Sequence, residues 1–362
     1  MTANRIASPT SPAHAGDFDS RNNKAQRVYI KQEKKMLRKT LILTLLIALL
    51  TACAPQATPT TESISTDIPA VEAPATEAPV VVTDGESMTY TDGLGREVTL
   101  DATPERIVSL APSNTEILFA VGAGSQVVGR DEFSDYPEEA ASIEVIGGSF
   151  GEYNAEAIVA LEPDLVLAAE INPPELVQQL EDLGLTVYYL ANPTTLEGMY
   201  TNLETVAQLT GHDATELVDS LKARVAAIDE KIMPLSSRIA VFYEIDATDP
   251  TKPWTYGSGT FGDLLISRAG GFNIGGNAEN DPYPQLSLEQ IVKSNPSVII
   301  LGDALWGVTP ESVVARPGWE TIEAVKNNNI FPIDDNLISR PGPRLVDGLE
   351  QLAKLLRPGM FE

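Results

Sequence analysis

From Tyr90 onward, short runs of β-branched residues alternate with segments whose apolar residues recur at helical spacing. This alternation is typical of parallel α/β architecture. The short runs predict strands at 107–110, 127–129, 165–169, 187–190, 239–245, 298–301 and 330–333. The helical patterns predict helices at 113–121, 155–161, 174–183, 196–210, 261–269, 288–294, 321–327 and 344–356. Asn154 and Ser287 are residue types that cap helix N-termini, and each is expected to begin the helix that follows it.

The chain also repeats itself. Residues 156–167 align with residues 289–300 at a constant offset of 133, and Glu, Ile, Val and Pro coincide. A second pair of segments, 106–108 and 238–240, agrees at an offset of 132. Such self-similarity predicts two equivalent halves of about 120 residues. Each half is expected to be an α/β lobe with a ligand crevice at the carboxyl ends of its strands.

The segment between the two halves predicts a connecting helix at 213–236. Its first part, 213–233, contains no Gly or Pro, and its apolar residues follow helical spacing: Leu217, Val218, Leu221, Val225 and Ile228. A helix of about 20 residues is roughly 30 Å long. The predicted lobes are therefore residues 88–212 and 237–362, and one stiff helix between them favours rocking by a few degrees over a wide hinge.

The N-terminal region has the pattern of an export signal. Arg38 and Lys39 precede the apolar run 41–50, which is shorter than the roughly 20 residues needed to span a membrane. Leu50-Thr51-Ala52-Cys53 follows and resembles a bacterial lipobox. The resemblance implies a signal peptide at 36–52, cleavage before Cys53 and a lipid anchor on its thiol. The alternative is a short membrane helix beside a chance cysteine.

Two segments flank this signal. Residues 1–35 are polar and precede a complete signal peptide, so they are interpreted as an upstream mis-called extension, with a genuine cytoplasmic extension as the alternative. Residues 53–87 begin at the lipidated Cys and are rich in Pro, Thr, Ala and Glu. Such a composition buries too little apolar surface to offset its ordering entropy, which predicts a disordered tether.

Composition excludes several classes of function. The chain carries 25 Lys+Arg against 51 Asp+Glu, a net charge of −26, which argues against nucleic acid as a partner. His14 and His212 are its two histidines, and Cys53 is its one cysteine. An internal disulfide, a cysteine zinc site and a Cys–His dyad are therefore excluded, and a zinc or manganese site built on several histidines is disfavoured.

Four segments together resemble one family: 106–122, 134–137, 156–168 and 340–356. They are similar to the substrate-binding proteins of ABC importers for cobalamin (vitamin B12), iron–siderophore or haem complexes, and the resemblance spans about 88–358. It implies two Rossmann-like lobes joined by a rigid helix, the class III architecture. It also implies a monomer that performs no catalysis, needs no resident cofactor and delivers its ligand to a permease dimer driven by an ATPase. Its location would be extracytoplasmic, at the outer face of a single membrane or in a periplasm.

Glu156 and Glu289 occupy the same position of the repeat, one in each lobe. In the family that the chain resembles, an equivalent pair of surface carboxylates docks onto arginines of the permease dimer. The two glutamates are therefore expected to be permease-docking residues. The alternative is that each only interacts favourably with the dipole of its own helix.

The ligand is expected to bind where strand-end loops of both lobes converge. Aromatic faces suit a large, flat, partly apolar ligand, and a few polar groups fix its orientation. The candidates with exposed tips are Tyr136, Phe150, Trp254, Tyr256, Trp306 and Arg340. Each aromatic is alternatively ordinary core, and Arg340 is alternatively a salt bridge at the domain edge. Arg344, one helical turn further on, is expected to face solvent or a carboxylate.

The charge of these loops bears on the ligand. A tri-anionic catecholate complex should recruit several cations, whereas Arg340 and a doubtful Arg130 are the available ones. A corrinoid or near-neutral hydroxamate iron chelate therefore fits slightly better. Haem held through an axial tyrosine, for example Tyr136 or Tyr256, remains an alternative.

Two further patterns point to other chemistry. Residues 257–262 match G-x-G-x-x-G, but a loop-like segment precedes them where a dinucleotide site needs a strand, so they are expected to open a helix. Glu244, Asp246 and Asp249 form a local carboxylate cluster, which would suit an enzyme. No other catalytic pattern accompanies them, and solvated loop acids are the favoured interpretation.

Overall fold

The computed structural model describes residues 87–148, 151–278 and 281–361. The predicted extension, signal peptide, Cys53 and most of the tether lie outside these ranges, as does Phe150. Within them, no helix combines the length and the apolar character needed to cross a bilayer.

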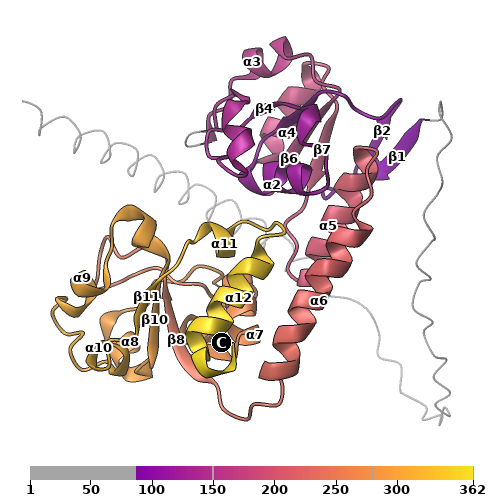
Figure 1. Cartoon of the computed structure of the whole chain (residues 1–362). Helices are drawn as coiled ribbons and strands as arrows, with labels where there is room; N and C mark the ends of the chain where they lie inside the picture. The colour runs from indigo at the N-terminus through magenta and orange to yellow at the C-terminus, as the bar shows by residue number, and fades with distance from the viewer. Residues whose placement is uncertain (1–86, 149–150, 279–280, 362) are drawn as a thin grey trace, which may run out of the picture. The chain divides into compact units, whose positions relative to one another are not determined.

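The first lobe, coloured from indigo to magenta in Figure 1, contains a parallel sheet. Its described strands follow the order β5-β4-β3-β6-β7. The strands are β3 (Ile107–Ser109), β4 (Val127–Arg130), β5 (Glu144–Val145), β6 (Leu165–Ala169) and β7 (Val187–Leu190). The helices are α2 (Pro112–Ala120), α3 (Ala155–Ala160), α4 (Pro174–Asp182) and α5 (Leu196–Leu209). Every residue of β6 is buried, as expected for an apolar strand inside a parallel sheet.

The second lobe contains another parallel sheet, whose described strands follow the order β11-β10-β8-β9. The strands are β8 (Ile239–Glu244), β9 (Gly271–Asn273), β10 (Val298–Leu301) and β11 (Ile330–Pro332). The helices are α7 (Phe261–Arg268), α8 (Leu288–Ser294), α9 (Pro310–Val314), α10 (Glu323–Lys326), α11 (Asn336–Ser339) and α12 (Leu345–Leu356). The predicted class of two α/β lobes with parallel sheets is therefore confirmed.

The strands and helices predicted within the two lobes are present, and their ends agree with the prediction to within two residues. Four strands were not predicted. An antiparallel hairpin of β1 (Met88–Thr91) and β2 (Glu97–Leu100) precedes the first sheet, and its turn donates from Gly93 N–H to the Tyr189 carbonyl (2.7 Å). Strand β5 consists of two residues, both exposed, and β9 is only three residues long and begins with Gly, so neither carries a strong apolar signal.

The internal repeat is confirmed by local geometry. Helices α3 and α8 are capped by the side chains of Asn154 and Ser287, and each helix leads into a central strand of its sheet. Beyond each helix lies a non-glycine residue in the left-handed region, Glu162 (φ 46°) and Asn295 (φ 44°). These two residues are 133 positions apart, so the aligned segments adopt the same backbone conformation at an uncommon position.

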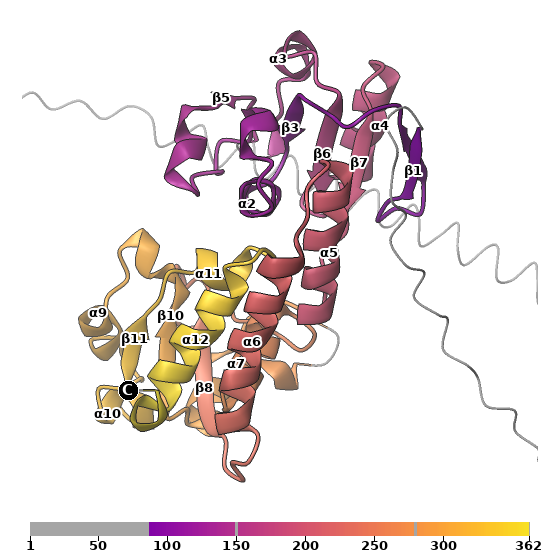
Figure 2. The same ribbon diagram turned by 45° about the vertical axis from the view of Figure 1, so that its right-hand side comes forward.

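The predicted connecting helix is α6 (Thr215–Ile232), which is shorter at both ends than the expected 213–236. Asp213 accepts a hydrogen bond from the Thr215 N–H (2.8 Å) before the first turn, and Pro234 follows soon after the last. Helix α12 lies beside α6 in both views (Figures 1 and 2), and Arg224 of α6 pairs with Asp347 and Glu350 of α12.

One hydrophobic cluster runs through both lobes and α6. It contains Ile107 and Leu203 from the first lobe, Val225 from α6, and Val241 and Leu349 from the second. A continuous buried cluster resists separation because opening it would expose apolar surface to water. The link between the lobes is therefore a packed core as well as a helix.

Candidate ligand-binding site

The carboxyl ends of the parallel strands lead into the loops that carry the sequence-predicted site residues. Tyr136 follows β4, Trp254 and Tyr256 follow β8, Trp306 follows β10, and Arg340 follows β11. In parallel α/β sheets this edge is where ligands bind. The topology therefore brings the four residues of the second lobe to one edge of its sheet.

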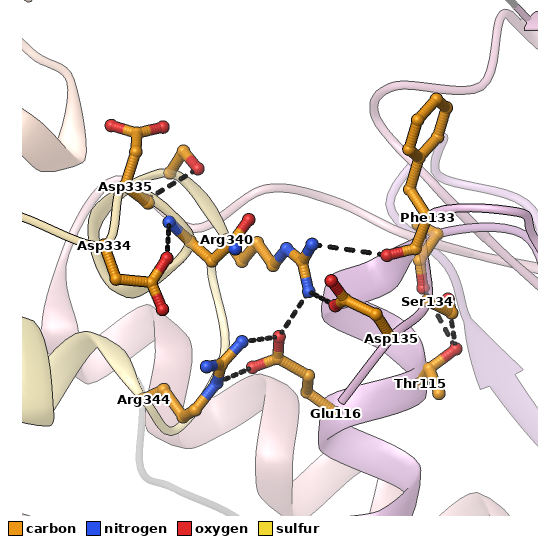
Figure 3. Close-up of polar contacts among 12 residues, drawn as sticks. Thr115, Glu116, Phe133, Ser134, Asp135, Asp334, Asp335, Arg340 and Arg344 are labelled. Carbon is orange, nitrogen blue, oxygen red and sulfur yellow. Dashed lines mark hydrogen bonds and ion pairs between the residues drawn. The ribbon is translucent and has the colours of Figure 1, made fainter. Parts of the chain in front are cut away.

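Arg340 and Arg344 extend from the turn between α11 and α12 to the first lobe, where both bind Glu116 of α2 (Figure 3). Arg344 makes two bonds to the carboxylate, Nε–Oε2 at 2.9 Å and Nη2–Oε1 at 2.5 Å. Arg340 Nη1 donates to Oε1 at 3.1 Å. The Glu116 side chain is 0% exposed, so these bonds compensate a buried charge.

The same arginines hold the loop after β4. Arg340 donates to Asp135 Oδ1 (2.6 Å) and to the Phe133 carbonyl (3.2 Å), as Figure 3 shows. The guanidinium of Arg344 stacks 3.9 Å from the centre of the Tyr136 ring. Arg340 is therefore the salt bridge that the alternative interpretation expected, and Arg344 faces a carboxylate. Tyr136 is 45% exposed beside them.

Buried polar groups secure this loop from its own lobe. The Ser134 hydroxyl bonds Thr115 Oγ1 (2.7 Å) and donates to the carboxylate of Asp131. Burial raises the pKa of Asp131, although the Ser134 hydrogen bond and nearby arginines oppose that change. For Arg344, burial lowers the guanidinium pKa, but the hydrogen bonds and charge of Glu116 outweigh burial and raise it. Arg344 therefore stays cationic.

Arg130 provides no cation to the loops. It is buried, and its guanidinium donates to backbone carbonyls, including those of Ala140 (2.8 Å) and Asp131 (3.0 Å). Its charge is thus used to hold the loops of its own lobe. The three arginines named for these loops all have internal partners.

The prediction that Tyr256 has an exposed tip is wrong. It is 4% exposed, and its hydroxyl donates to Asp335 Oδ1 (3.1 Å), which also accepts from Tyr243 (2.7 Å). The rings of Tyr243 and Tyr256 meet edge to face, with centres 4.9 Å apart. Burial, followed by the negative charge of Asp335, raises the pKa of Tyr256 well above its usual range.

The two tryptophans are exposed. Trp254 is 43% exposed and is fixed by backbone bonds to Ile245 and Asp246, at 2.9 and 2.8 Å. Trp306 is 84% exposed at the end of the short helix η5 (Gly302–Trp306). Gly307 follows it with φ 92°, a backbone conformation that favours glycine.

Tyr283 was not predicted from the sequence as a site residue, and it adds one more aromatic side chain to the strand-end loops. It is 52% exposed, and its ring centre lies 6.1 Å from that of Tyr256. Burial, then the charges of Glu170 in the first lobe and Asp335 in the second, raise its pKa. Its signal in the sequence is weak, because it lies between two prolines in an irregular loop.

The carboxylate cluster after β8 is a mixed case. Asp246 and Asp249 are exposed, as expected of solvated acids, but that interpretation is wrong for Glu244. Glu244 is fully buried and binds Arg316 through two bonds of 2.5 and 2.7 Å. Burial, then the charge of Glu244, raise the pKa of the nearby Asp303 to about 7. Glu244 therefore belongs to a structural ion pair with Arg316, and Asp303 is a second acid beside that pair.

The glycine-rich segment 257–262 opens a helix, as expected. Thr260 caps α7 by accepting from the Asp263 N–H, and the glycines permit close packing. A Cβ at Gly262 would lie 2.1 Å from the Tyr256 ring, and one at Gly257 would lie 2.0 Å from the Asp281 carbonyl. Packing against the buried tyrosine accounts for this pattern without a nucleotide.

Glu156 and Glu289 are both exposed and lie in the first turn of α3 and α8. The two residues are therefore equivalent in exposure and in helix position. Among the residues that the structure describes, no cluster of three His, Cys, Asp or Glu side chains suits a metal ion.

The sequence profile of the periplasmic binding protein family matches residues 107–337, and the chain belongs to this family. An ABC transporter substrate-binding lipoprotein of Bacillus subtilis is 34% identical over 76% of this chain and 87% of its own. A cobalamin-binding protein of Halobacterium salinarum is 33% identical over 74% of this chain and 73% of its own. The apo periplasmic haem-binding protein of a Roseiflexus species matches with a TM-score of 0.63 and 28% identity, over 71% of this chain and 99% of that one.

These relatives confirm the resemblance and the two-lobed class III architecture. The protein is a substrate-binding component of ABC transport, with a small-molecule ligand and a transporter as partners, and it is not an enzyme. It belongs to an extracytoplasmic class of protein.

Proposed function

We propose that this protein captures a corrinoid between the strand-end loops of its two lobes and delivers it to the permease of an ABC importer. The observation that carries the proposal is the contrast between aromatic and cationic side chains on those loops. Trp254, Trp306, Tyr136 and Tyr283 keep exposed surface, whereas Arg340 and Arg344 are neutralised by carboxylates.

This balance suits a bulky ligand with little net negative charge. Stacking on aromatic faces buries a flat ring at low entropic cost. An anionic chelate would need to displace Glu116 from two arginines, which would leave a buried carboxylate without partners. The cobalamin-binding relative supports the same class of ligand. A near-neutral ferric hydroxamate meets the same charge requirement and is the second candidate.

Haem is less well supported. Axial ligation by Tyr256 would require its buried hydroxyl to leave Asp335, and its raised pKa opposes the tyrosinate form. Tyr136 is exposed, but the Arg344 guanidinium already covers part of its ring. The haem-binding structural relative keeps this ligand among those to be tested.

The proposal includes the route to the membrane. Cys53 would carry the lipid anchor, so that the folded lobes remain at the outer face of the membrane. Glu156 and Glu289 would contact arginines of a dimeric permease, one glutamate for each half of that dimer. Their equivalent positions and exposure support this, because a symmetric partner needs the same contact twice.

The test is the absorption spectrum of the purified protein after incubation with cyanocobalamin, a ferric hydroxamate siderophore or haemin, each followed by desalting. One equivalent of retained corrin spectrum is expected. Retention of the ferric chelate alone would identify an iron receptor, and retention of haemin alone would favour the axial-tyrosine alternative. Retention of none would contradict all three ligand assignments while leaving the family intact.

A further inference from the structure

Glu116 links the two lobes at a single buried point. Its carboxylate lies on α2, and its hydrogen bonds come from Arg340 and Arg344, more than 220 residues away in the chain. A Cβ added at Gly342, which lies between these arginines, would be 3.7 Å from Glu116 Oε2, so the turn packs directly on α2. The two guanidinium groups repel each other, and the negative charge of Glu116 offsets that repulsion.

The same two arginines also contact the loop after β4. Arg344 lies over the Tyr136 ring, and Arg340 binds Asp135 and the Phe133 carbonyl. Figure 3 shows the contacts that Phe133 and Asp135 make with Arg340. With Tyr136, three of four successive residues of the loop contact the two arginines that bind Glu116.

The neighbouring residue of α2 holds the loop from the opposite direction. Thr115 bonds both Ser109 (2.8 Å) and Ser134 (2.7 Å), and Ser134 is fully buried. This bond fixes the loop backbone on its own lobe, but it makes no contact with the Tyr136 ring. The Arg344 guanidinium, by contrast, lies 3.9 Å from the centre of that ring.

We propose that Glu116 is a positioning residue, which holds Arg344 against Tyr136 and so sets the orientation in which the first lobe presents this ring to a ligand. The role in ligand binding rests on the function proposed above. The orientation of the ring in the ligand-free protein does not.

The first experiment therefore uses no ligand. The full chain is purified in detergent with 3-fluorotyrosine, and the fluorine resonance of Tyr136 is assigned with Tyr136→Phe. Glu116→Gln is expected to shift or broaden this resonance and to leave that of Tyr90 unchanged. Asp229→Asn is the matched control, because Asp229 also binds an arginine through two bonds, to Arg268 at 2.9 and 2.6 Å. An unchanged Tyr136 resonance in Glu116→Gln would overturn the proposal.

A second variant covers the case in which Glu116→Gln does not fold. Arg344→Lys retains the positive charge beside Glu116 but loses the planar group that stacks on the ring. It is expected to displace the Tyr136 resonance as well. A resonance identical to that of the unaltered protein would contradict the role assigned to Arg344.

The ligand experiment measures coupling. Glu116→Gln and Tyr136→Ala should each weaken cyanocobalamin binding by about tenfold, and the double variant should be little weaker than either one. Fully additive losses would mean that Glu116 acts by a route other than Tyr136 and would overturn the proposal. If the unaltered protein binds no cyanocobalamin, the corrinoid assignment fails, and the fluorine spectra alone decide the positioning role.

Discussion

At the scale of single residues, the buried carboxylates differ in the number of cations that face them. Glu116 meets two arginines, whereas Glu244 and Asp303 share the one guanidinium of Arg316. Asp303 Oδ2 accepts a hydrogen bond from the Ala247 N–H (3.2 Å), and its other oxygen accepts none from the part of the chain that the structure describes. A second buried negative charge at this point is therefore unfavourable.

This arrangement predicts a pH-dependent stability. The pKa of Asp303 rises from 3.8 to about 7 on folding, so between these values the folded protein holds a proton that the unfolded chain has lost. The contribution of Asp303 to the free energy of unfolding is therefore greatest below pH 4 and declines as pH rises toward 7. Asp303→Asn mimics the protonated acid and is expected to stabilise the protein at pH 8 by about 1–3 kcal/mol, with a much smaller gain at pH 4.

Urea unfolding of the unaltered protein and of Asp303→Asn at both pH values measures this difference. Asp249→Asn is the control, because Asp249 is exposed in the same region. Equal gains at pH 4 and pH 8 would show that the substitution acts through packing and not through the proton.

At the scale of elements, the equivalent helices α3 and α8 each present one glutamate. Reversing both charges, Glu156→Lys with Glu289→Lys, is expected to lower transporter-dependent uptake by about tenfold or more, because complementary charges across an interface would become repulsive. Ligand affinity of the purified protein should change by less than about twofold, since the substitutions act on the permease contact.

The matched control reverses Glu175 and Glu311, which are also exposed first-turn acids, one in each lobe, on α4 and α9. This control variant should transport normally. Equal loss of uptake in both variants would attribute the effect to net charge, and loss of affinity in the test variant would place Glu156 and Glu289 at the ligand.

Elements were more predictable from the sequence than the site was. Helix α8 has a capping serine and a regular apolar pattern, which are local signals, and its predicted bounds agree with the structure. The partner of Glu116 has no local signal, because the arginines that bind it lie 224 and 228 residues away. The burial of Tyr256 likewise depends on a tertiary contact, the hydrogen bond from its hydroxyl to Asp335, which the spacing of residues in the sequence does not encode.

At the scale of the whole molecule, the shared hydrophobic cluster predicts one cooperative unfolding transition. The three tryptophans, Trp254, Trp306 and Trp319, all lie in the second lobe, so their fluorescence reports on that lobe alone. Far-ultraviolet circular dichroism reports on the helices of both. The two signals should give the same denaturant midpoint, and separate midpoints would mean that the lobes unfold independently.

The shared cluster also bears on how such a receptor can diversify. Because α6 and α12 pack together and contribute to one core with both sheets, a lobe is not an exchangeable module. A chimera that joins one lobe of this protein to the opposite lobe of a relative would place unmatched apolar surfaces at that seam. Inherited change in ligand preference would therefore proceed more readily by substitution in the strand-end loops than by recombination of whole lobes.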